Sequence, residues 1–453
     1  MTKVDILIIG AGTAGEYAAG TAKQFVDSVG MIEKGPVGGE CIFHACIPTK
    51  ALVHAARTYK KMRGAGFFGL PTVQAEANYA DVKAFKDRIV SGIGTGRDRR
   101  WIDRGIKLFR GSAYFRSPTE VVVADEVIQA DKIIVATGSV PAVPPIPGLR
   151  ETGYITNIEA LDLESAPERL AIVGGGPIGV EFANIFAAFG SEVHIYEALD
   201  RILAVEDEEV SQVVAQLFAE QGISASTSML VSEVRATGAG KLVVARSADG
   251  EEKREEYDQI LVATGRRPGL DDLKLEAAGI EYTKKGISVD AALQTNLPHI
   301  WAAGDVTGGF LYTYVAGEQG KTAVTNAVGG RRTELNYEVL PRATFCDPEV
   351  ASVGLTEKQA QAHGHQVKTG KFEYANLTRP IEANETDGFI KVVADAESGR
   401  ILGGHIVGAE ASSLIHEVAL AMAYKVKASD VGNMLHSYPT LSEGVRYACQ
   451  AVA

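Results

Sequence analysis

One glycine-rich pattern occurs twice in this chain, and this duplication constrains the fold more than any other feature. Residues 10–15 read GAGTAG and residues 174–179 read GGGPIG, and each follows an apolar run typical of a buried strand. After each pattern come an apolar helical segment and a second strand that ends in a glutamate. Strand, glycine turn, helix and strand in this order are typical of a βαβ unit. Two copies predict an α/β protein with two Rossmann-like domains.

The residues of each pattern suit the binding of a dinucleotide. Gly10 permits the tight turn, Gly12 lets the backbone approach a pyrophosphate, and Gly15 lets the helix pack close to the strand. Glu33, at the end of the second strand, is placed to accept hydrogen bonds from a ribose. The second unit repeats these features at the same spacing, in Gly174, Gly176, Gly179 and Glu197.

Glu197 bears on the choice of nicotinamide nucleotide. A carboxylate at this position suits a ribose hydroxyl and repels a 2′-phosphate. The next basic residue, Arg201, comes four positions later and has an ion pair as its alternative role. We therefore expect NADH to be preferred over NADPH.

The end of another predicted strand also occurs twice. Residues 133–138 read IIVATG and residues 260–265 read ILVATG, so each apolar run ends in a turn of small residues. A nucleotide can lie close to the backbone at such a turn, which makes Thr137, Gly138 and Gly265 candidate cofactor contacts. The duplication thus predicts two nucleotide-binding units with two different ligands.

Length and charge limit the classes of function. The 453 residues are too many for one core, so we expect two or three domains. A net charge of −12 argues against nucleic acid or an anionic membrane surface as a partner. No apolar run approaches the roughly 18 residues that a membrane span needs. The N-terminus leads directly into a strand, without a signal peptide, so we expect a cytoplasmic protein.

The segment GGECIFHACIPTK contains two of the chain's four cysteines, Cys41 and Cys46. In a reducing compartment, such a close pair is more often catalytic or metal-binding than structural. A zinc site needs about four ligands in paired spacing. Cys346 and Cys449 are too scattered for this, and His44 alone does not complete the set, so we expect no metal site. The pair is predicted to be a redox dithiol that exchanges two electrons as its disulfide opens and closes.

Together these motifs resemble the pyridine nucleotide–disulfide oxidoreductases, the group of dihydrolipoamide dehydrogenase, glutathione reductase and mercuric reductase. The resemblance runs from end to end and includes both glycine patterns, the Cys-x4-Cys-x-Pro-Thr-Lys run and both Ala-Thr-Gly turns. Residues 295–305 (TNLPHIWAAGD) are similar to the second flavin motif of the family. Residues 345–356 (FCDPEVASVGLT) are similar to the start of its dimerisation domain.

The resemblance implies three domains. An FAD-binding domain occupies residues 1–147 and resumes at 269–335, with an NAD-binding domain inserted at 148–268. An α+β dimerisation domain at 336–453 implies a homodimer in which each active site is completed by the partner.

The resemblance also implies roles for individual residues. Cys46 would be the thiolate next to the flavin, and Cys41 the interchange thiol that meets the substrate. Lys50 would lie near the flavin and pair with Glu181. A thiolate at a helix N-terminus is stabilised by the helix dipole, and a nearby lysine adds to this. The other candidate FAD contacts are Lys34, Gly39, Gly304 and Asp305, the last near the ribityl chain.

Two departures from the family pattern concern proton transfer. Glu40, Phe43 and Ala45 replace the usual Thr, Asn and Gly around the cysteines, and His44 is a candidate proton carrier beside the dithiol. At the C-terminal end, family members that use a dithiol substrate have a His before Pro-Thr, oriented by a Glu five residues beyond it.

Here that segment reads LHSYPTLSE, so Tyr438 precedes the proline and His436 comes two residues earlier. A phenol with a pKa near 10 is a poor base at neutral pH. Two alternatives stay open: Tyr438 donates a hydrogen bond to a thiolate or a metal-bound ligand, or a backbone shift brings His436 into the base position. Glu443 is the candidate acidic partner. Mercuric reductases also have Tyr here, but they carry a C-terminal cysteine pair, whereas Cys449 is solitary.

The predicted function is that of a flavoprotein oxidoreductase, similar to dihydrolipoyl dehydrogenase. Electrons pass between NADH, FAD, the Cys41–Cys46 disulfide and a disulfide or dithiol substrate of small-molecule or lipoyl type. In the alternative, the acceptor is a metal ion, a quinone or a sulfur species, which the missing histidine favours. A third hypothesis, a nucleotide-binding sensor without turnover, is disfavoured by the presence of both cysteines, Lys50 and Glu181. The sequence leaves open the acceptor, the physiological direction and membership of a larger complex.

Overall fold

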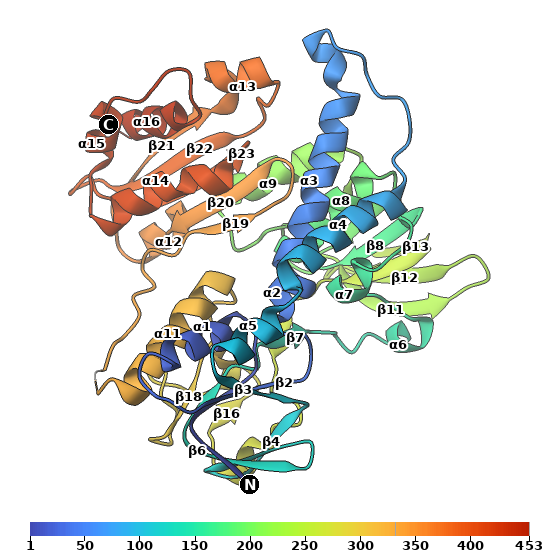
Figure 1. Cartoon of the computed structure of the whole chain (residues 1–453). Helices are drawn as coiled ribbons and strands as arrows, with labels where there is room; N and C mark the ends of the chain where they lie inside the picture. The colour runs from blue at the N-terminus through green and yellow to red at the C-terminus, as the bar shows by residue number, and fades with distance from the viewer. Residues whose placement is uncertain (331, 453) are drawn as a thin grey trace. The chain divides into compact units, whose positions relative to one another are not determined.

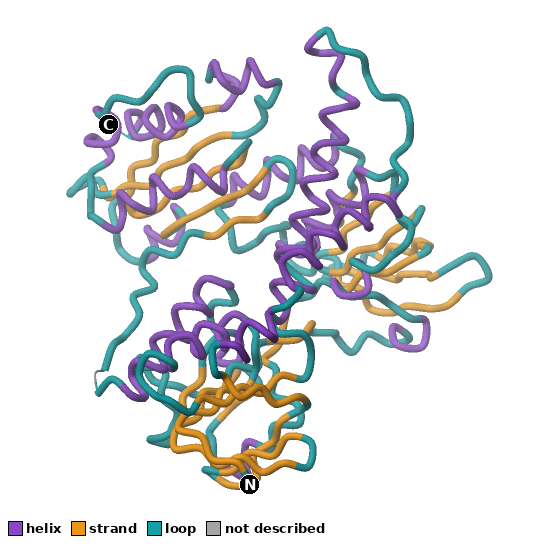
Figure 2. Tube along the Cα trace, viewed as in Figure 1, coloured by secondary structure: helices purple, strands orange, loops and turns teal. Residues whose placement is uncertain are grey.

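The computed structural model describes residues 1–330 and 332–452 and divides into two compact units. Both units mix helices with strands, and Figures 1 and 2 show their elements. In the part of the chain that is described, no helix is long and apolar enough to cross a membrane. The predicted domain bounds stay predictions. The first unit comprises Met1–Ala51, Ala84–Ala142 and Gly265–Leu335, and the second comprises Leu52–Lys83, Val143–Thr264 and Asn336–Ala453.

The first unit is built on a sheet of order β3-β2-β1-β6-β5-β4, with β18 also paired to β6. Its central strands run parallel, as the βαβ pattern predicts, and the register places Ile8 beside both Met31 and Ile134. These side chains are fully buried, so apolar residues fix the register. The strands are β1 (Thr2–Ile9), β2 (Val29–Glu33), β3 (Ile106–Arg110), β4 (Ala113–Ser117), β5 (Glu120–Val123), β6 (Glu126–Val135) and β18 (Ile300–Ala302).

Two helices of the first unit, α1 (Thr13–Ala22) and α11 (Thr313–Val328), pack closely against each other. A Cβ at Gly320 would lie 2.2 Å from the carbonyl oxygen of Ala14, so glycine permits this approach. The remaining elements of this unit are α2 (Gly39–Phe43), α5 (Arg97–Asp103), β7 (Ser139–Pro141), β15 (Arg266–Pro268), α10 (Leu275–Ala278), β16 (Tyr282–Thr283), β17 (Gly286–Ile287) and η2 (Asp305–Thr307). Two helices, α3 (Cys46–Arg63) and α4 (Tyr79–Gly94), each contribute residues to both units.

The middle of the chain forms a second parallel sheet, of order β10-β9-β8-β14, in the second unit. An antiparallel meander, β11-β12-β13, accompanies it, and Tyr196 and Tyr257 are buried in the core that these strands share. The elements are η1 (Ala65–Phe68), α6 (Leu149–Thr152), α7 (Asn157–Ala160), β8 (Arg169–Val173), α8 (Pro177–Ala188), β9 (Glu192–Tyr196), α9 (Glu208–Glu220), β10 (Ser224–Ser226), β11 (Leu230–Ala236), β12 (Lys241–Arg246), β13 (Glu252–Tyr257) and β14 (Gln259–Val262).

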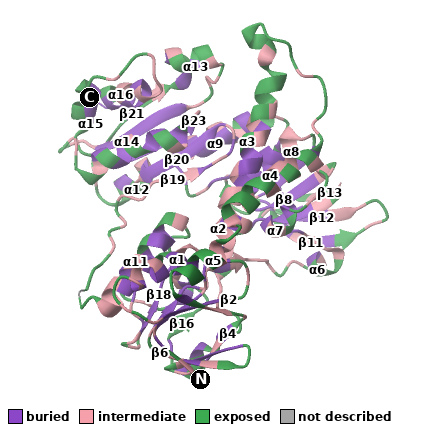
Figure 3. Cartoon of the chain, viewed as in Figure 1, coloured by how far each residue is buried: buried purple, intermediate pink, exposed green. Residues whose placement is uncertain are grey.

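The C-terminal part forms an antiparallel sheet of order β19-β20-β23-β22-β21, packed by α14 and α16. Figure 3 shows its central strands as buried, and residues of β22 such as Phe389 and Val392 are fully inaccessible. The elements are β19 (Arg342–Thr344), β20 (Glu349–Gly354), α12 (Glu357–Ala362), β21 (Val367–Glu373), η3 (Tyr374–Asn376), α13 (Thr378–Ala383), β22 (Phe389–Asp395), β23 (Ile401–Gly408), α14 (Ala411–Ala423), α15 (Ala428–Asn433) and α16 (Ser442–Ala451).

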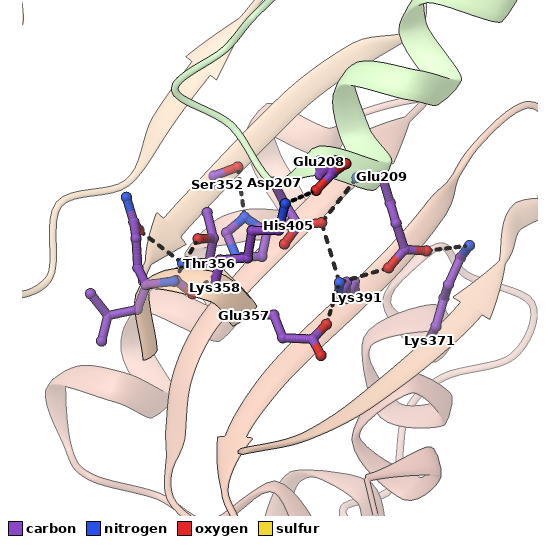
Figure 4. Close-up of polar contacts among 12 residues, drawn as sticks. Asp207, Glu208, Glu209, Ser352, Thr356, Glu357, Lys358, Lys371, Lys391 and His405 are labelled. Carbon is purple, nitrogen blue, oxygen red and sulfur yellow. Dashed lines mark hydrogen bonds and ion pairs between the residues drawn. The ribbon is translucent and has the colours of Figure 1, made fainter. Parts of the chain in front are cut away.

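A buried lysine links this C-terminal sheet to the N-terminus of α9. Lys391 lies 2.6 Å from Glu209, 3.0 Å from Glu357 and 3.2 Å from Asp207 (Figure 4). Burial lowers the pKa of Lys391, but the hydrogen bonds to Glu209 and Glu357 outweigh it, so the net shift is upward. The charged lysine therefore holds the acidic start of α9 on the sheet.

The predicted fold class is confirmed. Each glycine pattern stands between a parallel strand and a helix, and an α+β region with a sheet of its own follows.

Candidate functional site

The first glycine turn joins β1 to α1 and leaves no room for side chains at two of its glycines. Gly10 has φ +106°, and a Cβ there would lie 2.3 Å from the carbonyl oxygen of Ala136. A Cβ at Gly15 would lie 1.9 Å from the carbonyl oxygen of Gly10, so α1 packs directly on the turn. At Gly12, by contrast, the nearest atom to a Cβ is 4.0 Å away. Gly12 therefore borders open space at the N-terminus of α1, where a phosphate fits.

Gly39 brings the cysteine segment onto this turn. It has φ +62°, and a Cβ at Gly39 would lie only 2.7 Å from the Cα of Gly12. The N–H of the preceding Gly38 donates to the carbonyl oxygen of Ala11 at 2.8 Å. Two backbone segments thus pack without intervening side chains and form a cradle that fits the pyrophosphate of FAD.

Glu33 is held at the edge of the cradle by the backbone. Its carboxylate accepts from the N–H of Ala11 at 2.6 Å and from that of Gly35 at 2.8 Å. A carboxylate has about four acceptor positions, so two bonds leave capacity for a ribose hydroxyl. Lys34, beside it, is exposed.

The second glycine turn repeats this geometry position by position. A Cβ at Gly174 would lie 2.5 Å from the carbonyl oxygen of Ala263, and one at Gly179 would lie 2.0 Å from that of Gly174. Nothing lies within 4 Å of a Cβ at Gly176, which borders open space as Gly12 does. The carboxylate of Glu197 accepts from the N–H of Gly175 at 2.6 Å and of Leu199 at 2.8 Å. This cradle fits the pyrophosphate of a nicotinamide nucleotide.

The strands that follow the two Ala-Thr-Gly turns pair with each other. β7 starts at Ser139 and β15 starts at Arg266, and they run antiparallel. The Nε of Arg266 donates to the Oγ of Ser139 at 2.7 Å, and that hydroxyl donates to Asp305 at 2.6 Å. The guanidinium also donates to Glu40 at 3.0 Å. A chain of polar contacts therefore links Asp305 to the residue just before Cys41.

These polar contacts give a role to the glutamate that stands at position 40 in place of the usual threonine. Glu40 provides a carboxylate partner for Arg266, which a threonine would not. Sequence reasoning missed Ser139 and Arg266. The available signal was that each directly follows an Ala-Thr-Gly turn.

The other predicted residues near these turns have defined places. Thr137 donates through its Oγ1 to the carbonyl oxygen of Gly269 at 2.7 Å. Gly138 and Gly265 both have positive φ, with nothing within 4 Å of a Cβ. The N–H of Gly304 donates to the side chain of Gln319 at 2.7 Å.

The two cysteines lie on successive helices and are not joined by a disulfide. Cys41 is in α2, and Cys46 is the first residue of α3, whose first turn includes the proline. The pKa of Cys41 is raised, chiefly by its hydrogen bond to Cys46 and further by burial, whereas Thr313 and Lys50 oppose the shift. Cys41 is therefore the thiol that holds its proton more firmly than a free cysteine does.

Two helix N-termini are placed to stabilise a negative charge on Cys46. Its Sγ lies 3.3 Å from the Oγ1 of Thr313, in hydrogen-bond contact, and Thr313 is the first residue of α11. Since Cys46 itself starts α3, the positive ends of two helix dipoles meet at one sulfur. No sequence signal pointed to Thr313, because the contact joins residues far apart in the chain.

The bulky residues between the cysteines also have defined surroundings. The ring of Phe43 lies where a Cβ on Gly94 of α4 would be, at 2.7 Å, so this glycine makes room for it. His44 is half-buried beside Phe43, with ring centroids 6.4 Å apart. A proton-carrying role for His44 stays a prediction.

In the second unit, Glu181 is buried on α8 and accepts from the N–H of Phe345 at 2.9 Å. Its predicted pairing with Lys50 stays a prediction.

The C-terminal motif separates its three candidate residues. Tyr438 is 71% exposed, and its hydroxyl lies 3.1 Å from the Oγ1 of Thr378. The ring of His436 is mostly buried, with Nε2 2.8 Å from Glu417 and Nδ1 3.1 Å from the carbonyl oxygen of Met434. The partner of His436 is thus Glu417, which sequence reasoning missed.

Glu443 performs a different task in this motif. Its carboxylate accepts from the N–H of Thr440 at 3.1 Å and from the hydroxyl of Tyr447 at 3.4 Å. Glu443 therefore supports the turn after the proline, and the structure does not bring it to His436 or Tyr438.

The other two cysteines are buried. The Sγ of Cys346 donates to the carbonyl oxygen of Pro348 at 3.1 Å, and burial raises its pKa. Burial, and then the charge of Glu417, raise the pKa of Cys449 to about 12. Both thiols are protonated at neutral pH and are poor nucleophiles.

Comparison with known families accounts for nearly the whole chain. Residues 4–320 match the family described as pyridine nucleotide-disulphide oxidoreductase. Residues 340–449 match the family described as the dimerisation domain of pyridine nucleotide-disulphide oxidoreductase.

Individual relatives fall into named groups of enzymes. A mercuric reductase from Lysinibacillus sphaericus is 37% identical over 446 residues, which are 98% of this chain and 82% of the relative. A dihydrolipoyl dehydrogenase from Bacillus subtilis is 34% identical over 449 residues, which are 98% of this chain and 97% of the relative. Among solved structures, the Cu(II) complex of the HOCl-induced flavoprotein disulfide reductase RclA from Escherichia coli matches with a TM-score of 0.88 and 30% identity. That match covers 97% of this chain and 98% of the other.

The contact of Gly39 with Gly12 predicts how FAD binding responds to a single methyl group. We expect the Gly39→Ala protein to bind FAD about 5- to 150-fold more weakly, because overpacking of this kind costs about 1–3 kcal/mol. Gly69→Ala is a matched control, since Gly69 has φ +72° but nothing within 4 Å of a Cβ. Fluorescence titration of both apoproteins with FAD measures the difference. Equal FAD affinity in the two variants would contradict the proposed cradle.

Proposed function

Because this chain belongs to the pyridine nucleotide-disulphide oxidoreductase family, we propose that it uses NADH to reduce a thiol-binding metal ion at the Cys41–Cys46 dithiol. The family is dependent on FAD and NAD(P)H, and the chain is a flavoprotein oxidoreductase. The structural observation that favours a metal ion over a dithiol is the C-terminal motif, where an exposed phenol stands before the proline and His436 is bonded to Glu417.

The residues of the two cradles would hold the cofactors. Gly12, Gly39 and Glu33 would bind FAD, and Asp305 would lie toward its ribityl chain. Gly176 and Glu197 would bind the nicotinamide nucleotide. FAD supplies the means to take an electron pair from NAD(P)H and to pass it to a disulfide.

The two thiols have distinct tasks in this proposal. Cys46 keeps its negative charge beside the flavin because Thr313 and two helix N-termini stabilise it. Cys41 stays protonated beside Cys46 and reaches the substrate. When a metal ion binds, Cys41 loses its proton and both sulfurs become ligands, since the thiolate is the form that binds metal.

The proposed reaction balances with one NADH for each electron pair. NADH gives NAD⁺, a proton and two electrons, which reduce one Hg(II) by two electrons or two Cu(II) ions by one electron each. Tyr438 donates a hydrogen bond to a ligand of the metal and needs no change of protonation. The names of the mercuric reductase and of the RclA Cu(II) complex support an acceptor of this class.

A disulfide or dithiol of lipoyl type is the second candidate substrate. The dihydrolipoyl dehydrogenase relative matches over almost its full length, and Cys449 is a solitary buried thiol. Exchange with a dithiol needs a base that removes the substrate proton, and the ordinary pKa of a phenol is too high for that task.

The dimerisation domain supports a homodimer in which residues of one subunit complete the site of the other. Tyr438 suits this arrangement, because a large aromatic side chain that is mostly exposed in one chain is available to a partner.

The choice of acceptor is tested with a panel of substrates. With the FAD-loaded protein, we expect NADH oxidation with Cu(II) or Hg(II) to be at least ~10-fold faster than with lipoamide. Loss of one hydrogen bond in Tyr438→Phe should lower kcat/KM for the metal by about tenfold. Lipoamide turnover that survives Tyr438→Phe and is abolished by His436→Asn would instead assign the base role to His436.

The preference for NADH is tested at Glu197. Backbone N–H groups hold the carboxylate of Glu197 in place. It would therefore repel a 2′-phosphate, and placing two like charges next to each other costs several kcal/mol. We expect Glu197→Gln to raise kcat/KM for NADPH at least ~10-fold relative to NADH. Glu192→Gln, at the exposed start of the same strand, is the control and should change neither value. The proposal is wrong if wild-type protein already uses both nucleotides equally.

A further inference from the structure

A pocket of about 250 Å³ lies between α3 and α8 in the second unit, and no residue of either glycine turn or of the Cys41–Cys46 segment lines it. Its apolar wall includes Val53 and Ala56 of α3 and Ile185 and Ala188 of α8. This volume is below the range that holds a nucleotide or a drug-sized ligand, so the pocket suits a molecule of one or two rings.

Positive charge gathers on one side of this pocket. Arg57, Lys60 and Arg63 all line it, and their spacing of three places them along one side of α3. Asp347 is the carboxylate of the lining and pairs with Lys60 at 2.6 Å. No carboxylate lies within ion-pair distance of Arg63 among the described residues; its guanidinium lies 5.8 Å from the ring centroid of Tyr59. Glu349 pairs with Arg57 and Asp347 pairs with Lys60, so Arg63 is the cation of the lining that keeps its positive charge without a carboxylate partner among the described residues.

Arg57 provides a second and independent indication that the pocket binds an anion. Its two terminal nitrogens donate to Glu349 and to the carbonyl oxygen of Cys346, each at 2.6 Å, so the guanidinium is fixed. Its Nε is buried and has no hydrogen-bond acceptor, one of two such side-chain atoms in the described part of the chain. A buried donor without an acceptor is unusual and is satisfied by an anion that brings an oxygen to it.

Tyr59 adds a flat surface at the same place. It lines the pocket, and its ring stacks on Phe189 with centroids 6.0 Å apart. The hydroxyl donates to the carbonyl oxygen of Ala75 at 3.0 Å, which holds the ring in position. An aromatic ligand gains from offset stacking against such a fixed ring.

We propose that this pocket binds a small aromatic carboxylate. The ring of the ligand packs between the apolar walls and Tyr59, and its carboxylate accepts hydrogen bonds from Arg57 and Arg63. This inference is independent of the acceptor proposed above, because no residue of the pocket takes part in that reaction.

The test uses 2-naphthoate as the probe and 2-naphthylmethanol as its uncharged counterpart. Isothermal titration calorimetry with the FAD-loaded protein, in saturating NAD⁺ to occupy the nucleotide site, measures binding of both. We expect one 2-naphthoate per chain and an affinity for the alcohol about tenfold lower, since a charge-assisted hydrogen bond is lost.

Three variants assign binding to the pocket. Ala188→Trp fills the space and should abolish binding of 2-naphthoate, and Arg63→Gln should weaken it about tenfold. Arg99→Gln is the control, because Arg99 is an exposed arginine on α5, paired with Asp103 outside the pocket. Arg63 is exposed at the end of α3, so we expect Arg63→Gln to fold. This variant therefore tests the proposal even if Ala188→Trp does not fold. The proposal is overturned if 2-naphthoate does not bind, if it binds no better than the alcohol, or if Arg63→Gln binds it as wild type does.

Discussion

The contact between the backbones of Gly12 and Gly39 is the constraint on which the rest of the candidate site depends. A Cβ on Gly39 would come within 2.7 Å of the Cα of Gly12, so the two turns meet this closely only because residue 39 is a glycine. Gly39 is also the first residue of α2, which carries Cys41, and α3 starts at Cys46 shortly afterwards. The geometry of the phosphate cradle therefore fixes the position of the dithiol. Cofactor binding and the redox pair are parts of one local structure.

A second constraint sets the charges of the two sulfurs. Cys46 starts α3 and contacts Thr313, the first residue of α11, while the hydrogen bond to Cys46 raises the pKa of the Cys41 thiol. The two sulfurs therefore differ: Cys46 is placed where a negative charge is stabilised, and Cys41 holds its proton more firmly. The polar chain from Asp305 through Ser139 and Arg266 to Glu40 then holds the start of the cysteine segment.

The sequence was sufficient to predict features that depend on local spacing. Short motifs predicted both glycine turns, the parallel strands around them and the proximity of Cys41 and Cys46. Where a positive φ or a close backbone contact permits only glycine, the requirement is visible in the sequence. Contacts between distant segments left no such pattern. Thr313, Arg266 and Glu417 reach their partners only through the packing of the sheets and helices. The motif around Tyr438 shows the limit most clearly, since spacing alone did not reveal that His436 is bonded to Glu417 or that Glu443 supports a turn.

The proposed reaction requires that electrons from NADH reach the Cys41–Cys46 pair. Anaerobic titration of the oxidised, FAD-loaded protein with one equivalent of NADH tests it most directly, with counting of the thiols that react with a chromogenic reagent before and after. We expect two new reactive thiols per chain and a long-wavelength absorbance from a Cys46 thiolate next to the flavin, which is absent in Cys46→Ser. Flavin bleaching with no new thiols, or the same absorbance in Cys46→Ser, would contradict it.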